Sequence, residues 1–367
     1  MRPKSLPALL SIGLFLLAAT GACSPKLVSS PPSAVEESTD GDVAVEDVRF
    51  THGTNVLAGS LFLPRGGGRR PAVALVLGSG AEDRVYGGAG PALGSHFARN
   101  GFVCLAWDKP GVGKSTGDFN AQNFPDRAEE ALAAVRFLRE RPEVRPDQIG
   151  LWGHSQGGMV VPLAASLSDQ VAFVIQVSGW QGTAWRQDAV RVEEELRANG
   201  FPEADVKDAT AFARARMDLI RGIGPFEDLE KAQERVKTRA WFVSVHWCDR
   251  TLFYSARRNV GYDTGPSWEK VRCPVLVIYG DNDRSSGPPD PLVKTIRQGL
   301  LKAGNHDVAV RIFTDADHSL CRVETGTRKN ATGRAKGGDP PDFVPGYLDA
   351  MTSWLDRRFG ATTTPDR

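Results

Sequence analysis

The sequence has no excess of charge of either sign. It holds 45 Lys and Arg against 44 Asp and Glu, which gives a formal net charge of +1 at pH 7. Proteins that bind the phosphate backbone of nucleic acids usually concentrate positive charge. The balance of charges therefore predicts no nucleic-acid partner, and any other partner has to be inferred from individual sites.

Histidine and cysteine are scarce and scattered. The 367 residues include six His and five Cys, and no C-x-x-C or H-E-x-x-H pattern occurs among them. Protein metal sites depend on such spacing, because several ligands must converge on one ion. We therefore expect neither a metal nor another cofactor.

The sequence also lacks an apolar run long enough to span a membrane. The apolar stretch near the N-terminus covers residues 6–19, whereas a membrane helix needs about 18 to 20 residues. Two basic residues precede this run, and the small residues 20–22 separate it from Cys23. This arrangement predicts a signal peptide over residues 1–22, and therefore an exported protein.

Residues 20–23 resemble the signal of bacterial lipoproteins, in which the cysteine is lipidated and becomes the first residue of the mature protein. Residues 23–42 are rich in Ser, Pro and acidic side chains, a composition typical of a flexible tether. The resemblance implies a lipid on Cys23 as the only membrane contact, at the cell envelope or in the periplasm. Thr20 departs from the lipoprotein pattern, so cleavage after Ala22 and free secretion is the alternative.

The four other cysteines fall into two pairs. Cys104 and Cys273 lie in strand-like apolar runs and are expected to be buried thiols. Cys248 and Cys321 could form a disulfide in an exported protein or could stay unpaired.

The chain has the composition of a globular domain, with 41% hydrophobic and 24% charged residues. Two alternating segments that flank the turn at 52–55 predict an antiparallel hairpin. After it, apolar runs of strand length alternate with amphipathic helical segments, which predicts an α/β domain over residues 43–360 with a mostly parallel sheet. The expected strands are 45–50, 57–63, 72–77, 102–107, 149–152, 171–178, 275–279 and 308–313, and the expected helices are 91–100, 124–141, 156–167, 291–301 and 343–359.

The alternation of strands and helices stops over residues 180–270. This stretch is amphipathic and helical in pattern, and it is rich in tryptophan, which predicts a helical cap inserted between two core strands. Its tryptophans would either line an apolar substrate pocket or pack the cap against the core. Residues 325–341 are polar and glycine-rich and predict a surface loop, and residues 361–367 predict a disordered tail. The tryptophans are Trp180, Trp185, Trp241, Trp247 and Trp268.

The segment Gly153-His154-Ser155-Gln156-Gly157 matches the pattern G-x-S-x-G between an expected strand and an expected helix. Small residues on both sides of the serine let the backbone make a strained turn that exposes the hydroxyl. The helix that follows presents free N–H groups and a positive dipole end to any negative charge that develops there. Ser155 is therefore a candidate nucleophile for attack on a carbonyl group.

Two further loops follow expected strands. Gly78-Ser79-Gly80 lies where open α/β sheets place their ligands. The segment 108–115 contains Gly-Lys-Ser, but the first glycine of a phosphate-binding loop would fall at Asp108. We interpret segment 108–115 as a tight turn and not as a nucleotide site.

Ser155, an acid near position 283 and His318 occur in the order Ser, Asp, His, each after a strand. From about residue 45 to residue 359 the chain resembles the α/β-hydrolase superfamily, most closely its esterase-like members, which are related to dienelactone hydrolases and to the catalytic domains of prolyl oligopeptidases. The resemblance implies an eight-stranded α/β-hydrolase fold with a helical cap. It rests on Gly78-Ser79-Gly80 with Asp83-Arg84, on the segments 108–115 and 153–158, and on Cys273-Pro274 through Asp283.

The resemblance implies a catalytic triad. Ser155 would be the nucleophile, His318 the general base and then the general acid, and Asp283 the carboxylate that fixes the imidazole tautomer. The family acid follows the strand-end glycine by three residues, so Gly280 selects Asp283 over Asp281. Among the six histidines, only His318 follows the last expected strand.

The resemblance also implies an oxyanion hole built from two backbone N–H groups. One belongs to Gln156, the residue after the nucleophile, and the other belongs to Ser79 in the loop after the third strand. The family usually has a histidine where this chain has Leu77, which is a departure in the loop.

The implied activity is hydrolysis of a small-molecule carboxylic ester through an acyl-enzyme. A peptidase or amidase on the same fold is an alternative, because the triad does not distinguish esters from amides. An ester is favoured because the sequence shows no propeller-like repeat domain that would restrict which peptides reach the active site. A non-catalytic envelope binding protein is the other alternative, and the three filled triad positions argue against it. The sequence makes no prediction of an oligomeric state.

Overall fold

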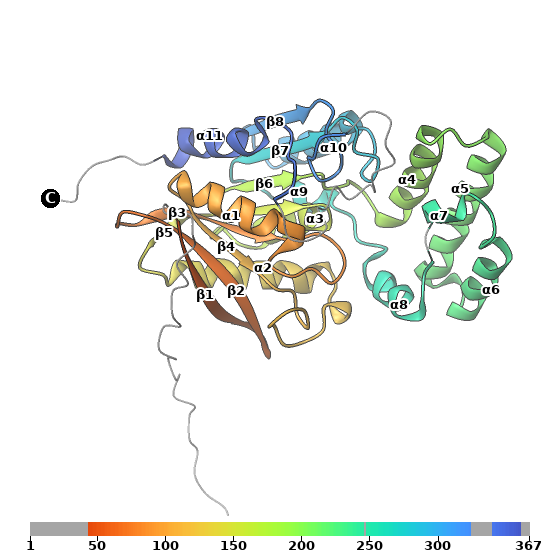
Figure 1. Ribbon diagram of the computed structural model, residues 1–367, viewed down its shortest axis with the longest axis horizontal. Helices are drawn as coiled ribbons and strands as arrows, with labels where there is room; N and C mark the ends of the chain where they lie inside the picture. The colour runs from red at the N-terminus through yellow and green to blue at the C-terminus, as the bar shows by residue number, and fades with distance from the viewer. Residues whose placement is uncertain (1–42, 246, 324–339, 361–367) are drawn as a thin grey trace, which may run out of the picture. The chain divides into compact units, whose positions relative to one another are not determined.

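A computed structural model describes residues 43–245, 247–323 and 340–360 (Figure 1). The expected signal peptide, the tether with Cys23, the C-terminal tail and most of the expected loop at 325–341 lie outside these residues. Export and lipidation therefore stay predictions. Among the described residues, no helix combines the length and the hydrophobicity that a membrane crossing needs.

The described chain contains an eight-stranded sheet with the strand order β1-β2-β4-β3-β5-β6-β7-β8. The β1–β2 and β2–β4 pairs are antiparallel, and every other neighbouring pair is parallel. This arrangement confirms the predicted mostly parallel sheet. The strands are β1 (Val43–His52), β2 (Asn55–Pro64), β3 (Arg70–Val76), β4 (Val103–Trp107), β5 (Val144–His154), β6 (Val174–Val177), β7 (Val275–Gly280) and β8 (Val308–Phe313).

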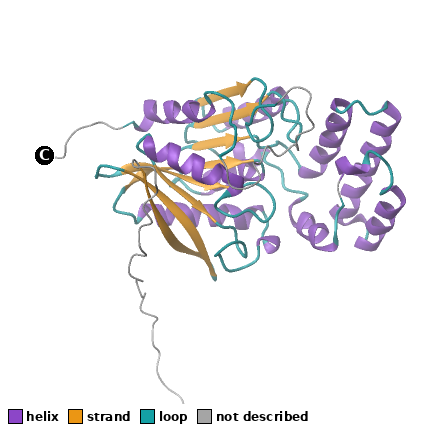
Figure 2. Ribbon diagram, in the orientation of Figure 1, coloured by secondary structure: helices purple, strands orange, loops and turns teal. Residues whose placement is uncertain are grey.

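Helices cover both faces of the sheet, as Figure 2 shows. Successive residues of β3 alternate between two hydrophobic clusters, with Val73 and Leu75 in one and Ala72, Ala74 and Val76 in the other. Burial on both faces explains why central strands such as β3 and β4 are apolar runs, and each buried Val or Leu contributes about 1.5–3 kcal/mol. One face packs on α1 (Ala89–Arg99) and α11 (Tyr347–Phe359), and the other on α2 (Phe124–Arg139), α3 (Gln156–Leu167) and α10 (Pro289–Lys302).

Most predicted boundaries lie within three residues of the observed ones, and two predicted starts are displaced further for local reasons. Helix α2 begins as expected, because Asn123 and Asp126 form a reciprocal capping box. Helix α11 was expected from residue 343 but begins at Tyr347, after Gly346 with a φ of 79°. Strand β5 begins at Val144, earlier than expected, because Arg70 pairs with Val144 ahead of a register shift.

The segment between β6 and β7 is helical, as predicted. Its helices enclose two hydrophobic clusters of their own, so much of the apolar surface of this segment is buried internally. The helices are α4 (Ala184–Ala198), α5 (Glu203–Asp218), the π-helix η3 (Leu219–Ile223), α6 (Phe226–Val236), α7 (Phe242–Val245), α8 (Arg250–Asn259) and α9 (Gly265–Trp268).

The tryptophans of the helical segment mainly serve packing. Trp241 is buried among α4, α5 and α7, and Trp268 is buried against the core of the sheet. Trp180 packs against the same core, whereas Trp247 is 42% exposed. The side chain of Trp185 lies outside the described residues. The structure thus favours the packing alternative over the pocket-wall alternative for Trp241 and Trp268.

The cysteines carry no disulfide in the described chain. Cys104, Cys248, Cys273 and Cys321 are all unpaired. Cys248 packs in a hydrophobic cluster of the helical segment, and Cys321 packs near α11. Burial raises the pKa of the Cys248 thiol to about 11 and that of Cys321 to about 12, so both thiols are protonated at neutral pH. A Cys248–Cys321 disulfide is therefore not formed in this structure.

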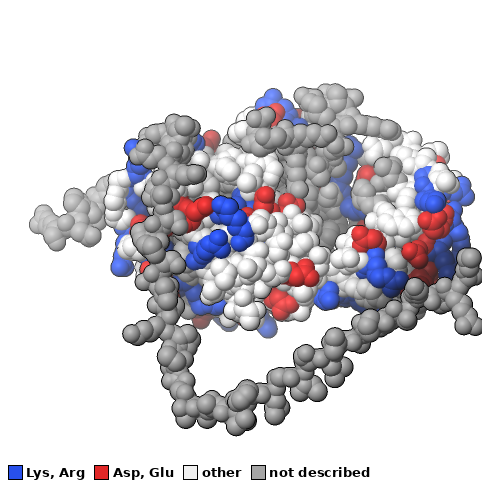
Figure 3. Space-filling view, turned by 60° about the horizontal axis from the view of Figure 1, so that its bottom comes forward, with Lys and Arg blue, Asp and Glu red and all other residues white. Residues whose placement is uncertain are grey.

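Charged side chains of both signs are interspersed on the face drawn in Figure 3. This distribution agrees with the near-zero net charge of the sequence.

Candidate active site

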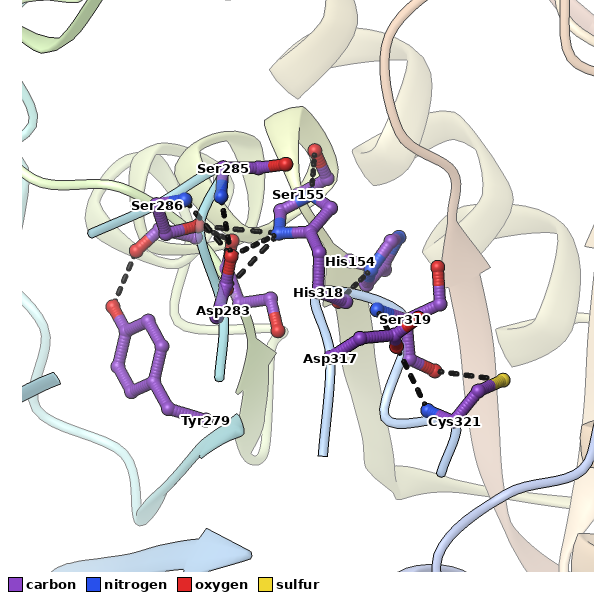
Figure 4. Close-up of polar contacts among 12 residues, drawn as sticks. His154, Ser155, Tyr279, Asp283, Ser285, Ser286, Asp317, His318, Ser319 and Cys321 are labelled. Carbon is purple, nitrogen blue, oxygen red and sulfur yellow. Dashed lines mark hydrogen bonds and ion pairs between the residues drawn. The ribbon is translucent and has the colours of Figure 1, made fainter. Parts of the chain in front are cut away.

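Three loops at the carboxyl ends of parallel strands bring Ser155, Asp283 and His318 together (Figure 4). Ser155 follows β5, Asp283 follows β7 and His318 follows β8. Nε2 of His318 lies 2.9 Å from Oγ of Ser155. Nδ1 of His318 lies 2.9 Å and 3.0 Å from the two carboxylate oxygens of Asp283. The arrangement is a continuous hydrogen-bonded chain from hydroxyl to imidazole to carboxylate.

Ser155 stands in a strained backbone conformation, with φ 56° and ψ −121°. A non-glycine residue reaches this region only when the surrounding structure enforces it. Two close backbone approaches flank this turn. A Cβ at Gly153 would lie 2.4 Å from the carbonyl oxygen of Gly157, and a Cβ at Gly157 would lie 2.0 Å from that of Val76. The glycines of G-x-S-x-G are thus required by these contacts and not by a left-handed backbone, since neither has a positive φ.

Replacing Gly157 by alanine is expected to destabilise the fold and to reduce activity. The new methyl group can fit only if α3 moves away from β3, and such overpacking costs about 1–3 kcal/mol or more. Chemical denaturation measures the loss. Gly261→Ala is the matched control, because a Cβ there would meet no atom within 4 Å. Equal unfolding midpoints for the two variants would contradict the close approach.

Asp283 is buried, and its negative charge is stabilised by several donors. The backbone N–H groups of Ser285 and Ser286 donate to its Oδ1 at 3.0 Å and 2.9 Å. Burial alone would raise the pKa of Asp283, but the charge of His318 and the hydrogen bonds from His318 and Ser286 outweigh it, so the pKa is lowered. The carboxylate therefore stays ionised at neutral pH.

An ionised carboxylate fixes the tautomer of His318. It can only accept hydrogen bonds, so Nδ1 of the imidazole carries the proton that it donates to Asp283. Nε2 of the neutral ring is then free of a proton and accepts the hydroxyl hydrogen of Ser155. By contrast, Asp281 is exposed and accepts a hydrogen bond from Asn282. The structure thus brings Asp283, and not Asp281, to the imidazole.

The two expected oxyanion donors lie beside the serine. Gln156 is the first residue of α3. Ser79 follows Gly78, at which a Cβ would lie only 3.4 Å from the Cβ of Ser155. Within the described residues, neither backbone N–H donates to a protein acceptor. Both N–H groups are thus available to a bound group.

His154 supports the site in a way that its sequence position alone did not reveal. Its Nε2 lies 2.8 Å from the backbone carbonyl oxygen of His318, and its Nδ1 lies 2.6 Å from the hydroxyl of Tyr86. The carbonyl can only accept, so Nε2 donates to it. The hydroxyl of Tyr86 also accepts the N–H of Gly78 at 3.2 Å. One chain of hydrogen bonds thus joins the loop of Ser79 to the loop of His318.

Two buried cations hold the Ser79 loop and were not expected at the site. The guanidinium of Arg127, on α2, donates to the carbonyl of Leu77 at 2.6 Å and to Oε1 of Gln156 at 2.5 Å. Burial lowers the pKa of Arg127, yet arginine stays protonated at any physiological pH. The ammonium of Lys109 donates to the carbonyls of Gly78 and Gly80. The segment 108–115 that we interpreted as a plain turn thus supports this loop.

No metal centre accompanies the site in the described part of the chain. No group of three or more His, Cys, Asp or Glu side chains is placed there to hold an ion.

The fold and the site define a class of protein. The family model described as the alpha/beta hydrolase family matches residues 75–325. The chain belongs to this family, which confirms the resemblance inferred from its motifs.

Known relatives add detail at low identity. The chain is 30% identical over 135 residues to the thiohydrolase aneE of Aspergillus aculeatus, which covers 36% of this chain and 41% of the relative. It is 36% identical over 89 residues to the polyketide transferase grgF of a Penicillium species, covering 24% of this chain and 30% of the relative. The chain thus spans less than half the length of these curated relatives.

Solved structures share the fold over nearly the whole chain. An acetyl xylan esterase from Paenibacillus superposes with a TM-score of 0.53 at 17% identity, covering 90% of this chain and 89% of the esterase. An esterase of Pyrococcus furiosus superposes with a TM-score of 0.54 at 15% identity, covering 92% and 99%. At these identities the likeness concerns the fold.

Proposed function

We propose that the protein is a serine hydrolase that cleaves carboxylic esters of small molecules through an acyl-enzyme. The observation that carries the proposal is the unbroken hydrogen-bonded chain from Ser155 through His318 to Asp283, set on a strained turn beside two available N–H groups. Esterases among the proteins of the same fold support the choice of substrate class.

In the first half of the reaction, Oγ of Ser155 attacks the carbonyl carbon of the ester while Nε2 of His318 takes the hydroxyl proton. The carbonyl oxygen becomes an oxyanion, which the N–H groups of Ser79 and Gln156 stabilise. Asp283 stabilises the imidazolium by its charge. The intermediate collapses when Nε2 returns the proton to the leaving alkoxide, which departs as an alcohol and leaves an acylated Ser155.

In the second half, a water molecule replaces the alcohol. His318 takes one of its protons as the water oxygen attacks the acyl carbon, and the oxyanion forms again at the same two N–H groups. Collapse breaks the bond to Oγ, and His318 gives the proton back to Ser155. The products are a carboxylic acid and the free enzyme.

The direct test is a panel of p-nitrophenyl esters of increasing chain length, with an acyl thioester and an aminoacyl p-nitroanilide alongside. The thioester belongs in the panel because a thiohydrolase is among the relatives. We expect turnover of esters and labelling of Ser155 by a fluorophosphonate. Cleavage of the anilide alone would favour a peptidase, and absence of both turnover and labelling would favour a binding protein.

A cavity of about 300 Å³ is lined by uncharged residues and is separated from the triad by Ser286, and it suits an uncharged part of the substrate. Ser286 lies between the cavity and the triad, because it lines the cavity and its Oγ lies 3.3 Å from Nδ1 of His318. The other lining residues carry no formal charge. They include Val190 of α4 and Leu292 and Thr295 of α10.

Filling this cavity is expected to shorten the acyl chains that the enzyme accepts. In Val190→Trp, the ratio of kcat/KM for a long-chain ester to that for the acetate should fall at least about tenfold, the discrimination that one or two methylenes provide in an apolar pocket. Leu252→Trp is the control, since Leu252 is exposed on α8 and does not line the cavity. An unchanged ratio in Val190→Trp would place the acyl chain elsewhere.

A further inference from the structure

Lys109 is buried although it carries a charge. It follows β4, and only 4% of its surface is exposed. Removing an ammonium group from water is costly, so such a group is retained where its hydrogen bonds are strong. Here the Nζ atom donates to the carbonyl oxygen of Gly78 and, at 2.8 Å, to that of Gly80. Both carbonyls belong to the loop that contains Ser79.

The carbonyl of Gly78 and the N–H of Ser79 belong to the same peptide group. A trans peptide directs its C=O and its N–H to opposite sides of the chain. When the carbonyl of Gly78 turns to Lys109, the N–H of Ser79 is therefore turned away from Lys109. The loop passes close to Ser155, so the direction of this one peptide group decides whether Ser79 can serve as a donor there.

A charged donor on the carbonyl also changes the strength of the N–H. Hydrogen bonds in a chain polarise one another, and the effect is larger where the dielectric constant is low. An ammonium on the oxygen of Gly78 draws electron density from the amide and makes the N–H of Ser79 a better donor. The positive charge of Lys109 lies on one side of the Gly78–Ser79 peptide group, and it also favours the negative charge of an oxyanion on the other side.

The remaining contacts of the loop do not replace this one. Tyr86 accepts the N–H of Gly78, and Arg127 binds the carbonyl of Leu77. Both lie on the N-terminal side of the Gly78–Ser79 peptide group. Among the hydrogen bonds of the described chain, that of Lys109 acts on the carbonyl of this peptide group itself.

We propose that Lys109 is a positioning residue of the oxyanion hole, whose ammonium orients and polarises the Gly78–Ser79 peptide group so that the N–H of Ser79 stabilises the oxyanion. The inference rests on the proposed ester hydrolysis. It concerns a step in which Lys109 does not touch the substrate, so its effect appears in the transition state and not in ground-state binding.

The test compares Lys109→Met, which removes both the charge and the donor, with Lys109→Gln, which keeps a neutral donor. Lys114→Met is the control, because Lys114 lies in the same loop but is exposed and pairs with Asp47. Labelling with a fluorophosphonate to completion gives the concentration of folded active sites. The values of kcat and KM are then measured on a p-nitrophenyl ester. Inhibition by an alkyl trifluoromethyl ketone is measured as well, because the ketone forms an oxyanion on addition of Ser155.

We expect Lys109→Met to lower kcat by about 10²–10³-fold, the loss that follows removal of an oxyanion donor, with KM changed less than about threefold. Affinity for the trifluoromethyl ketone should fall by a similar factor. Lys109→Gln should retain part of the kcat and part of the ketone affinity, since a neutral donor forms a hydrogen bond about half as strong as a charged one. Lys114→Met should match the wild type.

Two results would overturn the inference. One is a folded Lys109→Met or Lys109→Gln whose kcat and ketone affinity equal those of the wild type. The other is failure of both variants to fold, which would show that Lys109 stabilises the domain as a whole. A wild-type protein that turns over no ester and takes no fluorophosphonate label would instead refute the proposed function, so the two failures are distinguishable.

Discussion

Ser155→Ala is expected to reduce kcat by about 10⁶-fold in the proposed ester hydrolysis, measured on the best substrate of the p-nitrophenyl panel. Removal of a triad nucleophile can cause a loss of this size, because the covalent route is lost and the general base no longer has a hydroxyl to activate. What remains is the slow attack of water, aided by the oxyanion hole. The variant keeps a Cβ at the strained position, so its fold should match that of the wild type by circular dichroism. Stopped assays at high enzyme concentration measure the residual rate.

Ser286→Ala is the matched control for the nucleophile. Its hydroxyl also lies within reach of His318, 3.3 Å from Nδ1, but it donates to the backbone carbonyl of Ser178 at 2.7 Å. Its loss should lower kcat by less than about tenfold. A Ser155→Ala variant that keeps more than about 1% of the wild-type rate, or a Ser286→Ala variant that loses as much as Ser155→Ala, would contradict the assignment of the nucleophile.

The residues whose placement the sequence predicted best are those whose positions depend on the local backbone. Gly153 is needed because the backbone of Gly157 approaches it, and Gly157 is needed because the end of β3 approaches α3. The fixed spacing of the G-x-S-x-G pattern reflects both contacts. His318 could be chosen among six histidines because it follows the last strand, and the strand order of a parallel sheet brings such loops to one edge. The triad geometry thus follows from chain order and from the position of each loop.

The supporting residues could not be predicted, because their partners are distant in the sequence and bind backbone atoms. Arg127 reaches the carbonyl of Leu77, and His154 reaches that of His318. Every residue has a backbone carbonyl, so the sequence does not show which carbonyl a distant side chain binds.

The placement of the helical segment between β6 and β7 could not be predicted for the same reason. Its contacts with the core include hydrogen bonds from Arg258 and Asn259 to backbone carbonyls at 120 and 122, so a helical pattern predicted its helices but not their placement.

Asp283→Asn is expected to lower kcat by about 10⁴-fold while leaving the fold intact. The amide oxygen can take the place of Oδ1 and accept the N–H groups of Ser285 and Ser286. The amide NH₂ then points at Nδ1 of His318. A donor there requires Nδ1 to accept, so the imidazole carries its proton on Nε2. In that tautomer His318 cannot take the proton of Ser155, which is the cause of losses of this size in a Ser-His-Asp triad.

Asp281→Asn is the matched control, because it makes the same chemical change on the exposed carboxylate two residues earlier. It should keep the wild-type kcat. The reverse outcome, a large loss in Asp281→Asn and a small one in Asp283→Asn, would assign the acid to Asp281.

Stability measurements on the wild type and on Asp283→Asn separate the electrostatic contribution of Asp283 from its proposed role in catalysis. The folded-state pKa of Asp283 is lowered, so the ionised carboxylate favours the folded state at every pH above its unfolded pKa of about 3.9. That contribution is lost as the pH falls through the lower, folded-state pKa. The difference in unfolding free energy between the wild type and Asp283→Asn should therefore shrink as the pH falls below about pH 4. If the difference stays constant to the lowest pH, the neutral acid form of Asp283 stabilises the folded state as much as the carboxylate does. The charge of Asp283 would then not set the tautomer of His318.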